Sequence, residues 1–278
     1  MLPVLAALIM LCLPATGHAQ AGAQAEQDFA FAEGLYGQEN YELALTKYTA
    51  FIKANPDHAN MSLALFRAGE CSFRLERYAD AAPWFEQVTT RFPGSDEAET
   101  AWLWLGDARY KSGDYAGAAA AYEGLIAKFP DSQLATQASY WLAESYYHLA
   151  RYDEAIAAYR DALKRKLSDH EAPYALYSIG LSHLQLQQYD EAVKQFSQAL
   201  TRYPQSPVAA ECQYLVGSAY HSQGKLPAAI EAYGKVLSEH ANSNFAAWAQ
   251  AGLAGCHFQQ AEYEKWYVPH TDAAGLAE

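Results

Sequence analysis

Residues 102–130 read WLWLGDARYKSGDYAGAAAAYEGLIAKFP, and this stretch contains the pattern that decides the fold. Tyr115, Ala118 and Tyr122 are separated by three and four residues, which places them on one face of a helix. The same pattern recurs along the chain, with leucine in place of the first aromatic residue in the sixth copy. Its alanines are 37 residues apart each time: Ala44, Ala81, Ala118, Ala155, Ala192 and Ala229. A fixed period of this length predicts stacked copies of one supersecondary unit.

A second small residue stands twelve positions before each of these alanines. The series is Ala32, Gly69, Gly106, Ala143, Gly180, Gly217 and, in a degenerate seventh copy, Ala254. Helical spacings flank this site too, so each repeat is predicted to be a hairpin of two helices whose small residues let the axes approach closely. Generic antiparallel packing is the alternative, but it would not require a constant period. We therefore predict an all-α fold, a right-handed α-solenoid of stacked helical hairpins.

Proline and serine mark the predicted boundaries between repeats. The second helix is expected to end at a proline, which lacks an amide donor and clashes with the preceding turn: Pro56, Pro93, Pro130 or Pro204. Two positions after the proline site, a serine is expected to cap the next helix: Ser95, Ser132, Ser206 or Ser243. Leu167 and Ala241 replace the proline in repeats four and six, where we expect the helix end to fray or extend.

The repeat resembles the tetratricopeptide repeat family. The residues that carry the resemblance are Trp102, Leu105, Gly106, Tyr115, Ala118, Tyr122 and Pro130, and every other repeat keeps a subset. The resemblance covers residues 25–267, about 6.5 to 7 repeats, although the family's usual unit is 34 residues. The Phe/Tyr-Pro-x-Ser junctions are similar to those of bacterial envelope members, such as the barrel-assembly lipoprotein of the outer membrane and the Tol-Pal-associated coordinator of cell division. The resemblance implies a non-enzymatic scaffold for protein partners in outer-membrane assembly or coordination of cell-wall processes.

The N-terminal residues have the pattern of a signal peptide. An uncharged apolar run at residues 2–15 is followed by small residues, which predicts a leader over residues 1–21, cleaved after Ala19 or Ala21, and export to the periplasm. A buried apolar helix is the alternative. The leader lacks a Lys or Arg at its start, so the true start could lie upstream. Cys12 follows the bulky Leu11, and lipid anchoring is therefore not expected; association with the outer membrane would be peripheral, through partners.

Charge and cysteine content narrow the function. The 278 residues include 32 Asp and Glu against 19 Lys and Arg, a net charge of −13 that opposes binding to nucleic acid. The four cysteines, Cys12, Cys71, Cys212 and Cys256, are too sparse for a disulfide framework, and the last three are interpreted as small hydrophobic residues. The dispersed histidines, the lack of a phosphate-binding glycine loop and the lack of a nucleophile motif predict no enzyme, no cofactor, no metal and no small-molecule substrate.

Residues on the first helix of each repeat are the candidate binding groove. Aromatic residues recur three positions before and four positions after the small site, and an acidic residue follows that site in repeats one to four. The candidate residues are Phe29, Glu33, Tyr36, Phe66, Glu70, Phe73, Asp107, Tyr110, Tyr140, Glu144, Tyr147, Tyr177 and Tyr214. They favour an extended peptide or helix with apolar and basic residues.

Two alternatives remain open for this groove. The aromatic residues could pack only between repeats, and the acids could be neutralised at i,i+4 spacing, as Glu70 by Arg74, Asp107 by Lys111 and Glu144 by His148. A chaperone-like binder that delivers unfolded outer-membrane or exported proteins would use the aromatic residues without the acidic row. At the C-terminus, we expect a short second helix at residues 261–266 with Trp266 as a cap, and a flexible tail at residues 268–278.

Overall fold

The fold is described from a computed structural model, which describes the backbone of residues 15–274 and the side chains of residues 22–261. Within the described backbone the chain forms thirteen α-helices and no β-strand, which confirms the predicted all-α class. The chain divides into two compact units, residues 1–114 and 115–278, and each is described by itself. The division falls inside the third predicted hairpin.

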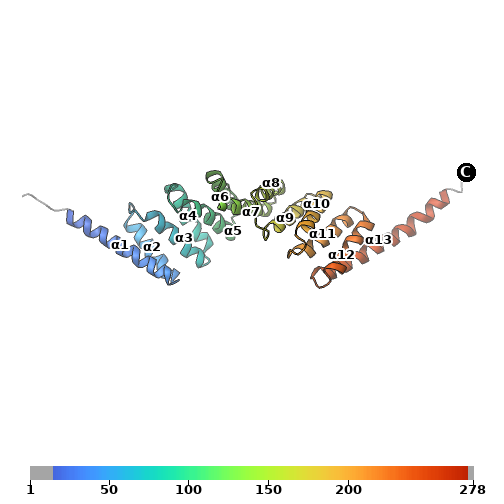
Figure 1. Cartoon of the computed structure of the whole chain (residues 1–278), viewed down its shortest axis with the longest axis horizontal. Helices are drawn as coiled ribbons and strands as arrows, with labels where there is room; N and C mark the ends of the chain where they lie inside the picture. The colour runs from blue at the N-terminus through green and yellow to red at the C-terminus, as the bar shows by residue number, and fades with distance from the viewer. Residues whose placement is uncertain (1–14, 275–278) are drawn as a thin grey trace, which may run out of the picture. The chain divides into compact units, whose positions relative to one another are not determined.

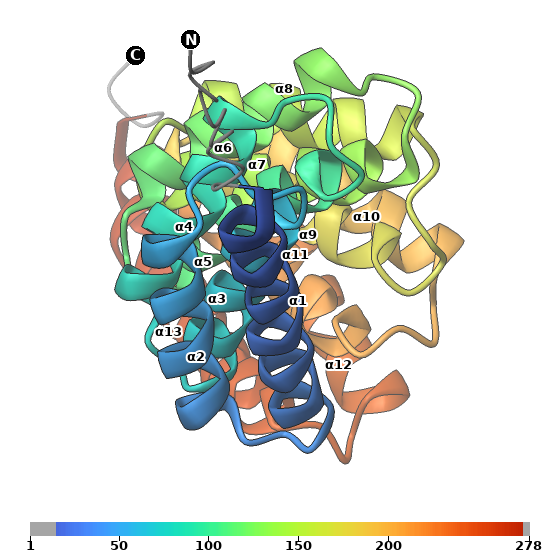
Figure 2. The same cartoon turned by 90° about the vertical axis from the view of Figure 1, so that its left-hand side faces the viewer.

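The first unit contains five helices that pack in chain order (Figure 1). They are α1 (Ala15–Gly37), α2 (Tyr41–Ala54), α3 (Met61–Arg74), α4 (Tyr78–Arg91) and α5 (Ala98–Lys111). Figure 2 shows α1 and α2 side by side, as expected for the two arms of one hairpin. Helices α1, α3 and α5 are the first helices of repeats one to three.

The second unit contains eight helices, each of which packs against the next. They are α6 (Tyr115–Lys128), α7 (Gln133–His148), α8 (Tyr152–Lys164), α9 (Ala172–Gln185), α10 (Tyr189–Arg202), α11 (Ala209–Ser222), α12 (Leu226–Glu239) and α13 (Phe245–Ala274). Helix α11 also contacts α13, so the first helices of neighbouring repeats touch as well as the two arms of a hairpin. This is the stacking that the sequence period predicts.

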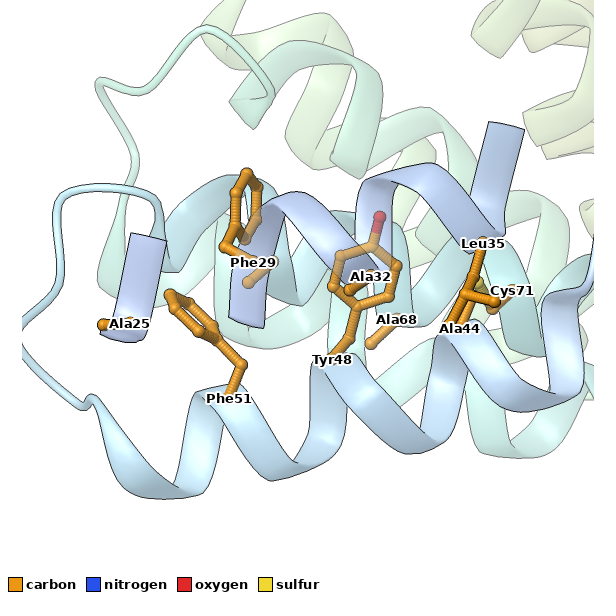
Figure 3. Close-up of a cluster of buried hydrophobic side chains, with 10 residues drawn as sticks. Ala25, Phe29, Ala32, Leu35, Ala44, Tyr48, Phe51, Ala68 and Cys71 are labelled. Carbon is orange, nitrogen blue, oxygen red and sulfur yellow. The ribbon is translucent and has the colours of Figure 1, made fainter. Parts of the chain in front are cut away.

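The core of the first repeat shows why small and aromatic residues alternate. Ala32 on α1 and Ala44 on α2 are fully buried, and the rings of Phe29, Tyr48 and Phe51 fill the space between the two helices around them (Figure 3). The ring of Phe29 lies 6.1 Å from that of Tyr48 and 5.3 Å from that of Phe51. The small residues are buried at the helix contact as predicted, and their role there is to make room for a ring from the opposite helix.

The proline sites end the helices as predicted, but the serine sites mostly do not cap. Helices α2, α4, α6 and α10 each end two residues before their proline. Ser132 accepts a hydrogen bond of 2.9 Å from the amide of Leu134 and is the N-cap of α7. The prediction is wrong for the other three sites: α5 and α11 begin later, at Ala98 and Ala209, without a side-chain cap, and the Ser206 and Ser243 hydroxyls have no hydrogen-bond partner in the described chain.

The second helices of repeats four and six do not extend where proline is missing. Helix α8 does not extend into the site where Leu167 replaces proline; it ends at Lys164 and is one residue shorter than most of the other helices. A capping box follows, in which the Ser168 hydroxyl and the Glu171 carboxylate bond each other and each other's backbone amides. In repeat six, α12 ends at Glu239, before the Ala241 site. The absence of proline therefore does not lengthen either helix.

Each hairpin turn contains a residue in the left-handed region, a feature that the sequence pattern did not reveal. After the first helix of repeats one to six, the residues with positive φ are Glu39, Glu76, Gly113, Ala150, Gln187 and Gly224, again 37 residues apart. In the first repeat the Asn40 amide bonds the Leu35 carbonyl and the Glu39 amide bonds the Tyr36 carbonyl, which is a Schellman motif. Four of the six positions lack glycine, so they gave no signal at the sequence level.

The C-terminal end of the chain differs from the prediction, and parts of both ends lie outside the described residues. Helix α13 is continuous from Phe245 to Ala274, so the predicted break between a first helix and a short second helix at residues 261–266 is not seen. The predicted cap, Trp266, lies outside the described side chains, and residues 275–278 of the predicted tail lie outside the described backbone. Residues 1–14 of the predicted leader also lie outside the described residues, and its cleavage remains a prediction.

The close approach at the small sites can be tested at Gly180. A Cβ added there would lie 2.4 Å from the ring of Phe196, so Gly180→Ala should destabilise the protein by about 1–3 kcal/mol through overpacking. Gly234 on α12 has nothing within 4 Å of such an atom, and Gly234→Ala should instead stabilise by about 0.5–1 kcal/mol. Urea unfolding followed by circular dichroism measures both. Equal effects of the two substitutions would contradict the packing described here.

Candidate protein-binding surface

The thirteen candidate groove residues all lie on first helices. Those of the first unit are on α1, α3 and α5, and those of the second unit are on α7, α9 and α11. The structure thus confirms that each of these residues lies on the first helix of its repeat. Their contacts, however, show that most of them pack against, or bond to, the second helix of their own repeat.

The aromatic residues before the small site pack against the aromatic residue of the second helix. Phe29 and Phe66 are buried, whereas Tyr140, Tyr177 and Tyr214 are half-buried and keep one edge exposed. The ring-centroid distances are 6.1 Å for Phe29–Tyr48, 5.6 Å for Phe66–Phe85, 5.8 Å for Tyr140–Tyr159, 6.2 Å for Tyr177–Phe196 and 5.7 Å for Tyr214–Tyr233. All five side chains pack between the two helices of their hairpin. Of the five, only the three tyrosines remain accessible to a partner.

The aromatic residues after the small site pack on the first residue of the second helix. The pairs are edge-to-face, at 5.7 Å for Tyr36–Tyr41, 5.0 Å for Phe73–Tyr78 and 5.5 Å for Tyr147–Tyr152. All three first-helix rings are half-buried, as is Tyr110 on α5. Each ring is thus held against its hairpin and stays partly accessible, although Trp104 also packs on Phe73 at 4.8 Å, which leaves an array of partly exposed aromatic edges.

We call Glu33, Glu70, Asp107 and Glu144, which follow the small sites of repeats one to four, the acidic row. Two of its members accept hydrogen bonds from buried tyrosines. In repeat one the hydroxyl of Tyr48 donates to Glu33, and in repeat four the hydroxyl of Tyr159 donates to Glu144 at 2.6 Å. Both tyrosines are fully buried. Burial and then the adjacent carboxylate raise the pKa of each phenol, so both remain protonated donors. The acids satisfy a polar group that would otherwise be buried without a partner.

In repeat two the acid has no tyrosine hydroxyl to bond, because Phe85 occupies the tyrosine site. Glu70 is buried and forms an ion pair of 2.7 Å with Arg67. Arg67 also bonds Glu33 at 3.2 Å and lies 4.4 Å from the ring centre of Tyr36. We call Glu33, Tyr36, Arg67 and Glu70 the Arg67 cluster; it connects α1 to α3.

Two of the ion pairs that the i,i+4 spacing suggested are not the ones formed. Glu70 pairs with Arg67 rather than with Arg74. Glu144 accepts hydrogen bonds from Tyr159 and, at 3.3 Å, from Ser178 on the next first helix, while His148 stacks on Tyr115 at 4.4 Å. Both carboxylates are therefore bonded within the protein, Glu70 by an arginine one turn away on the same helix and Glu144 by side chains of other helices. Asp107 is half-buried on α5.

The described residues contain no group of three or more His, Cys, Asp and Glu side chains placed to hold a metal ion. None of the described helices combines the length and apolar character that crossing a membrane requires. Cys71, Cys212 and Cys256 are buried free thiols, and burial raises the pKa of the first two to about 12.

The comparison with protein families agrees with this architecture. The family model described as tetratricopeptide repeat matches residues 29–96, 95–133, 103–172 and 177–247, which together are well over half of the chain. This chain belongs to the tetratricopeptide repeat family. No curated protein matches it.

Solved structures share the fold at low sequence identity. A crystal structure of MamA is 24% identical, with a TM-score of 0.55 over 65% of this chain and 92% of that chain. YrrB, described as a TPR protein with an unusual peptide-binding site, is 16% identical, with a TM-score of 0.55 over 73% of this chain and 97% of that one. The C-terminal part of a TPR repeat-containing protein from Cytophaga hutchinsonii is 16% identical, with a TM-score of 0.59 over 77% and 80%.

The bond between Tyr159 and Glu144 can be tested by a double-mutant cycle. Repeat five has Leu181 and Phe196 at the same two sites, so Glu144→Leu combined with Tyr159→Phe reproduces a pair that the chain already uses. Each single substitution leaves a buried polar group with fewer partners and should cost about 1–3 kcal/mol of unfolding free energy. The double variant should lose less than the two singles together, by roughly 1 kcal/mol. Strictly additive losses in urea unfolding would contradict the structural role of the acid.

Proposed function

We propose that this chain is a non-enzymatic scaffold of the bacterial cell envelope that binds a peptide or helix of a partner protein on its first helices. The observation that carries the proposal is the array of half-buried aromatic edges held rigid by each hairpin. Rigid aromatic side chains bind with little loss of conformational entropy, and for this reason they dominate many protein interfaces. Family membership supports a protein-interaction role, and YrrB, which shares the fold, is described as a TPR protein with an unusual peptide-binding site.

The charge of the first unit supports a partner with basic residues. Residues 1–114 carry fifteen Asp and Glu against eight Lys and Arg. Although Glu33 and Glu70 are bonded internally, their field still favours an approaching cation over an anion. We therefore propose that the partner segment contains apolar anchors for the aromatic edges and Lys or Arg beside them.

Two features of the sequence support the envelope location. The apolar run at residues 2–15 with small residues after it is typical of an export signal, and the junctions between repeats are similar to those of envelope members of the family. On this basis we propose that the mature protein is periplasmic and acts in outer-membrane assembly or in the coordination of cell-wall processes.

A chaperone-like binder of unfolded exported proteins is the second candidate. It is favoured by the internal bonding of the acidic row, because carboxylates that satisfy Tyr48 and Tyr159 have less capacity to select basic partners. In that case the aromatic edges alone would bind apolar segments, and neither the charge of a peptide nor the salt concentration would matter greatly.

Binding of synthetic peptides tests the proposed surface. We expect a short amphipathic peptide of Lys, Leu and Phe to bind, and Tyr36→Ala/Tyr110→Ala to weaken it about tenfold, or ~1.4 kcal/mol. Phe31→Ala is the matched control, because Phe31 is 55% exposed and lies at the side of α1 that faces α2, beside Lys47 and Ala50. Fluorescence anisotropy measures the affinities, and circular dichroism confirms that the variants are folded. Equal weakening by Phe31→Ala would refute the assignment of the surface.

The same assay separates the two candidates. A scaffold for basic partners should lose affinity as salt rises, and a peptide with Gln in place of Lys should bind about tenfold more weakly. Equal binding of the two peptides, independent of salt, would support the chaperone-like alternative.

The N-terminus of the mature protein tests the location. In a periplasmic extract of the native host, mass spectrometry should find the first residue immediately after Ala19 or Ala21. Protein that retains residues 1–21 and stays with the cytoplasmic fraction would contradict export.

A further inference from the structure

A basic pocket lies between α8 and α10 in the second unit, away from the first-helix surface. We propose that it binds an acidic peptide segment of a partner protein that carries an apolar side chain. The pocket has a volume of about 580 Å³. Its rim carries five cations: Arg160, Lys164, Lys166, Lys194 and Arg202. We call these five residues and the apolar residues beneath them the basic pocket.

The concentration of positive charge is unusual for this chain. Residues 115–278 contain eleven Lys and Arg against seventeen Asp and Glu, yet five of the eleven line this one pocket and no Asp or Glu does. All five side chains are exposed. Lys194 forms a long ion pair of 3.5 Å with Glu191. The nearby Asp161 is bonded to Arg165 at 2.7 Å, which leaves it less able to neutralise the rim.

The rim cations have few internal partners. Arg160, Lys164, Lys166 and Arg202 make no ion pair with any described residue. Clustered cations repel one another, and an anionic ligand relieves that repulsion. The rim is therefore complementary to a carboxylate-bearing segment.

The floor of the pocket is apolar, with one polar side chain. Leu167, Leu176 and Ile179 are buried beneath the rim. Gln195 lines the pocket, is only 7% exposed, and has no hydrogen-bond partner for its side chain among the described residues. Its amide atoms still reach solvent, and a ligand's carboxylate or backbone carbonyl can accept a hydrogen bond from Nε2 in place of water. The floor thus suits an apolar side chain beside a hydrogen-bonding group.

The irregular end of repeat four supplies part of the pocket. Helix α8 ends at Lys164, Lys166 adopts a positive φ, and the chain is then redirected by the capping box of Ser168 and Glu171. Leu167, which replaces the proline of other repeats, is buried in the floor. The departure from the repeat pattern therefore contributes one cation and one apolar side chain, Lys166 and Leu167, to the lining.

The surroundings favour a peptide over other anionic ligands. The excess of acidic residues in this unit opposes a long polyphosphate chain. The large exposed hydrophobic side chains of the described chain are Phe31, Leu43, Trp248 and Phe258, and none of them lines the pocket to enter a lipid layer. A short acidic segment with one apolar anchor fits both the rim and the floor.

The test uses a fluorescent peptide of Asp, Glu, Leu and Phe and the full chain. Lys164→Glu/Arg202→Glu should weaken binding at least about tenfold. The matched control is Lys53→Glu/Lys128→Glu, because all four are exposed cations in the last turn of a helix and both variants change the net charge equally. The control should stay within about twofold of the parent protein. Gln195→Leu should weaken binding several-fold without a change in charge.

Four outcomes would overturn the proposal. The first is that the control variant weakens binding as much as Lys164→Glu/Arg202→Glu does. The second and third are that a peptide with Lys in place of Asp and Glu, or one with Ser in place of Leu and Phe, binds as tightly as the original peptide. The fourth is that the protein does not bind the peptide but binds phosphatidylglycerol vesicles, and that Lys164→Glu/Arg202→Glu abolishes this vesicle binding. Tyr36→Ala/Tyr110→Ala should leave acidic-peptide binding unchanged, so this proposal and the proposed function can fail independently.

Discussion

The contact between a small residue on the first helix and an aromatic ring on the second is the constraint on which the rest of the structure depends. At Gly69 and Gly180 an added Cβ would lie 2.7 and 2.4 Å from the facing rings of Phe85 and Phe196, so the rings would have to shift. A ring that is completely buried contributes a large apolar area to a thin, two-helix layer. When that ring is tyrosine, as at Tyr48 and Tyr159, the fold must also supply a hydrogen-bond acceptor, and the acid one position after the small site does so. Packing thus dictates polarity on the adjacent helix face.

The repeating helices could be predicted from the sequence, but the side-chain contacts between helices could not. A constant period and helical spacings predicted the succession of helices up to α12, because they report which side chains share one helix face. They carry no information about contacts fifteen residues apart across a hairpin, such as Tyr48–Glu33, or between neighbouring first helices, such as Arg67–Glu33. The acidic row was therefore interpreted as a free surface when two of its members bond buried tyrosines and a third pairs with arginine. Residue identity also failed at the turns, where Glu39, Ala150 and Gln187 adopt a conformation for which glycine is the usual signal.

Regular and irregular parts of the chain therefore have different uses. In a regular repeat the first-helix aromatic residues, the small sites and the acids are all required for the hairpin, which leaves only ring edges for a partner. Those edges are rigid and recur along the chain, so they suit an extended ligand with modest sequence preference. Greater selectivity requires side chains that packing does not constrain.

Repeat four provides such side chains. The sequence signalled the departure through Leu167 in place of proline, but this signal did not identify a pocket without the early end of α8. Once that helix stops at Lys164, the stacking of α8, α9 and α10 continues while the junction follows a different path, so the cost of the irregularity stays local. A repeat protein can in this way change one junction without disturbing its neighbours, since each repeat contacts only the adjacent ones. The physical reason to look for specificity at the exceptions is that the consensus positions are already committed to holding the helices together.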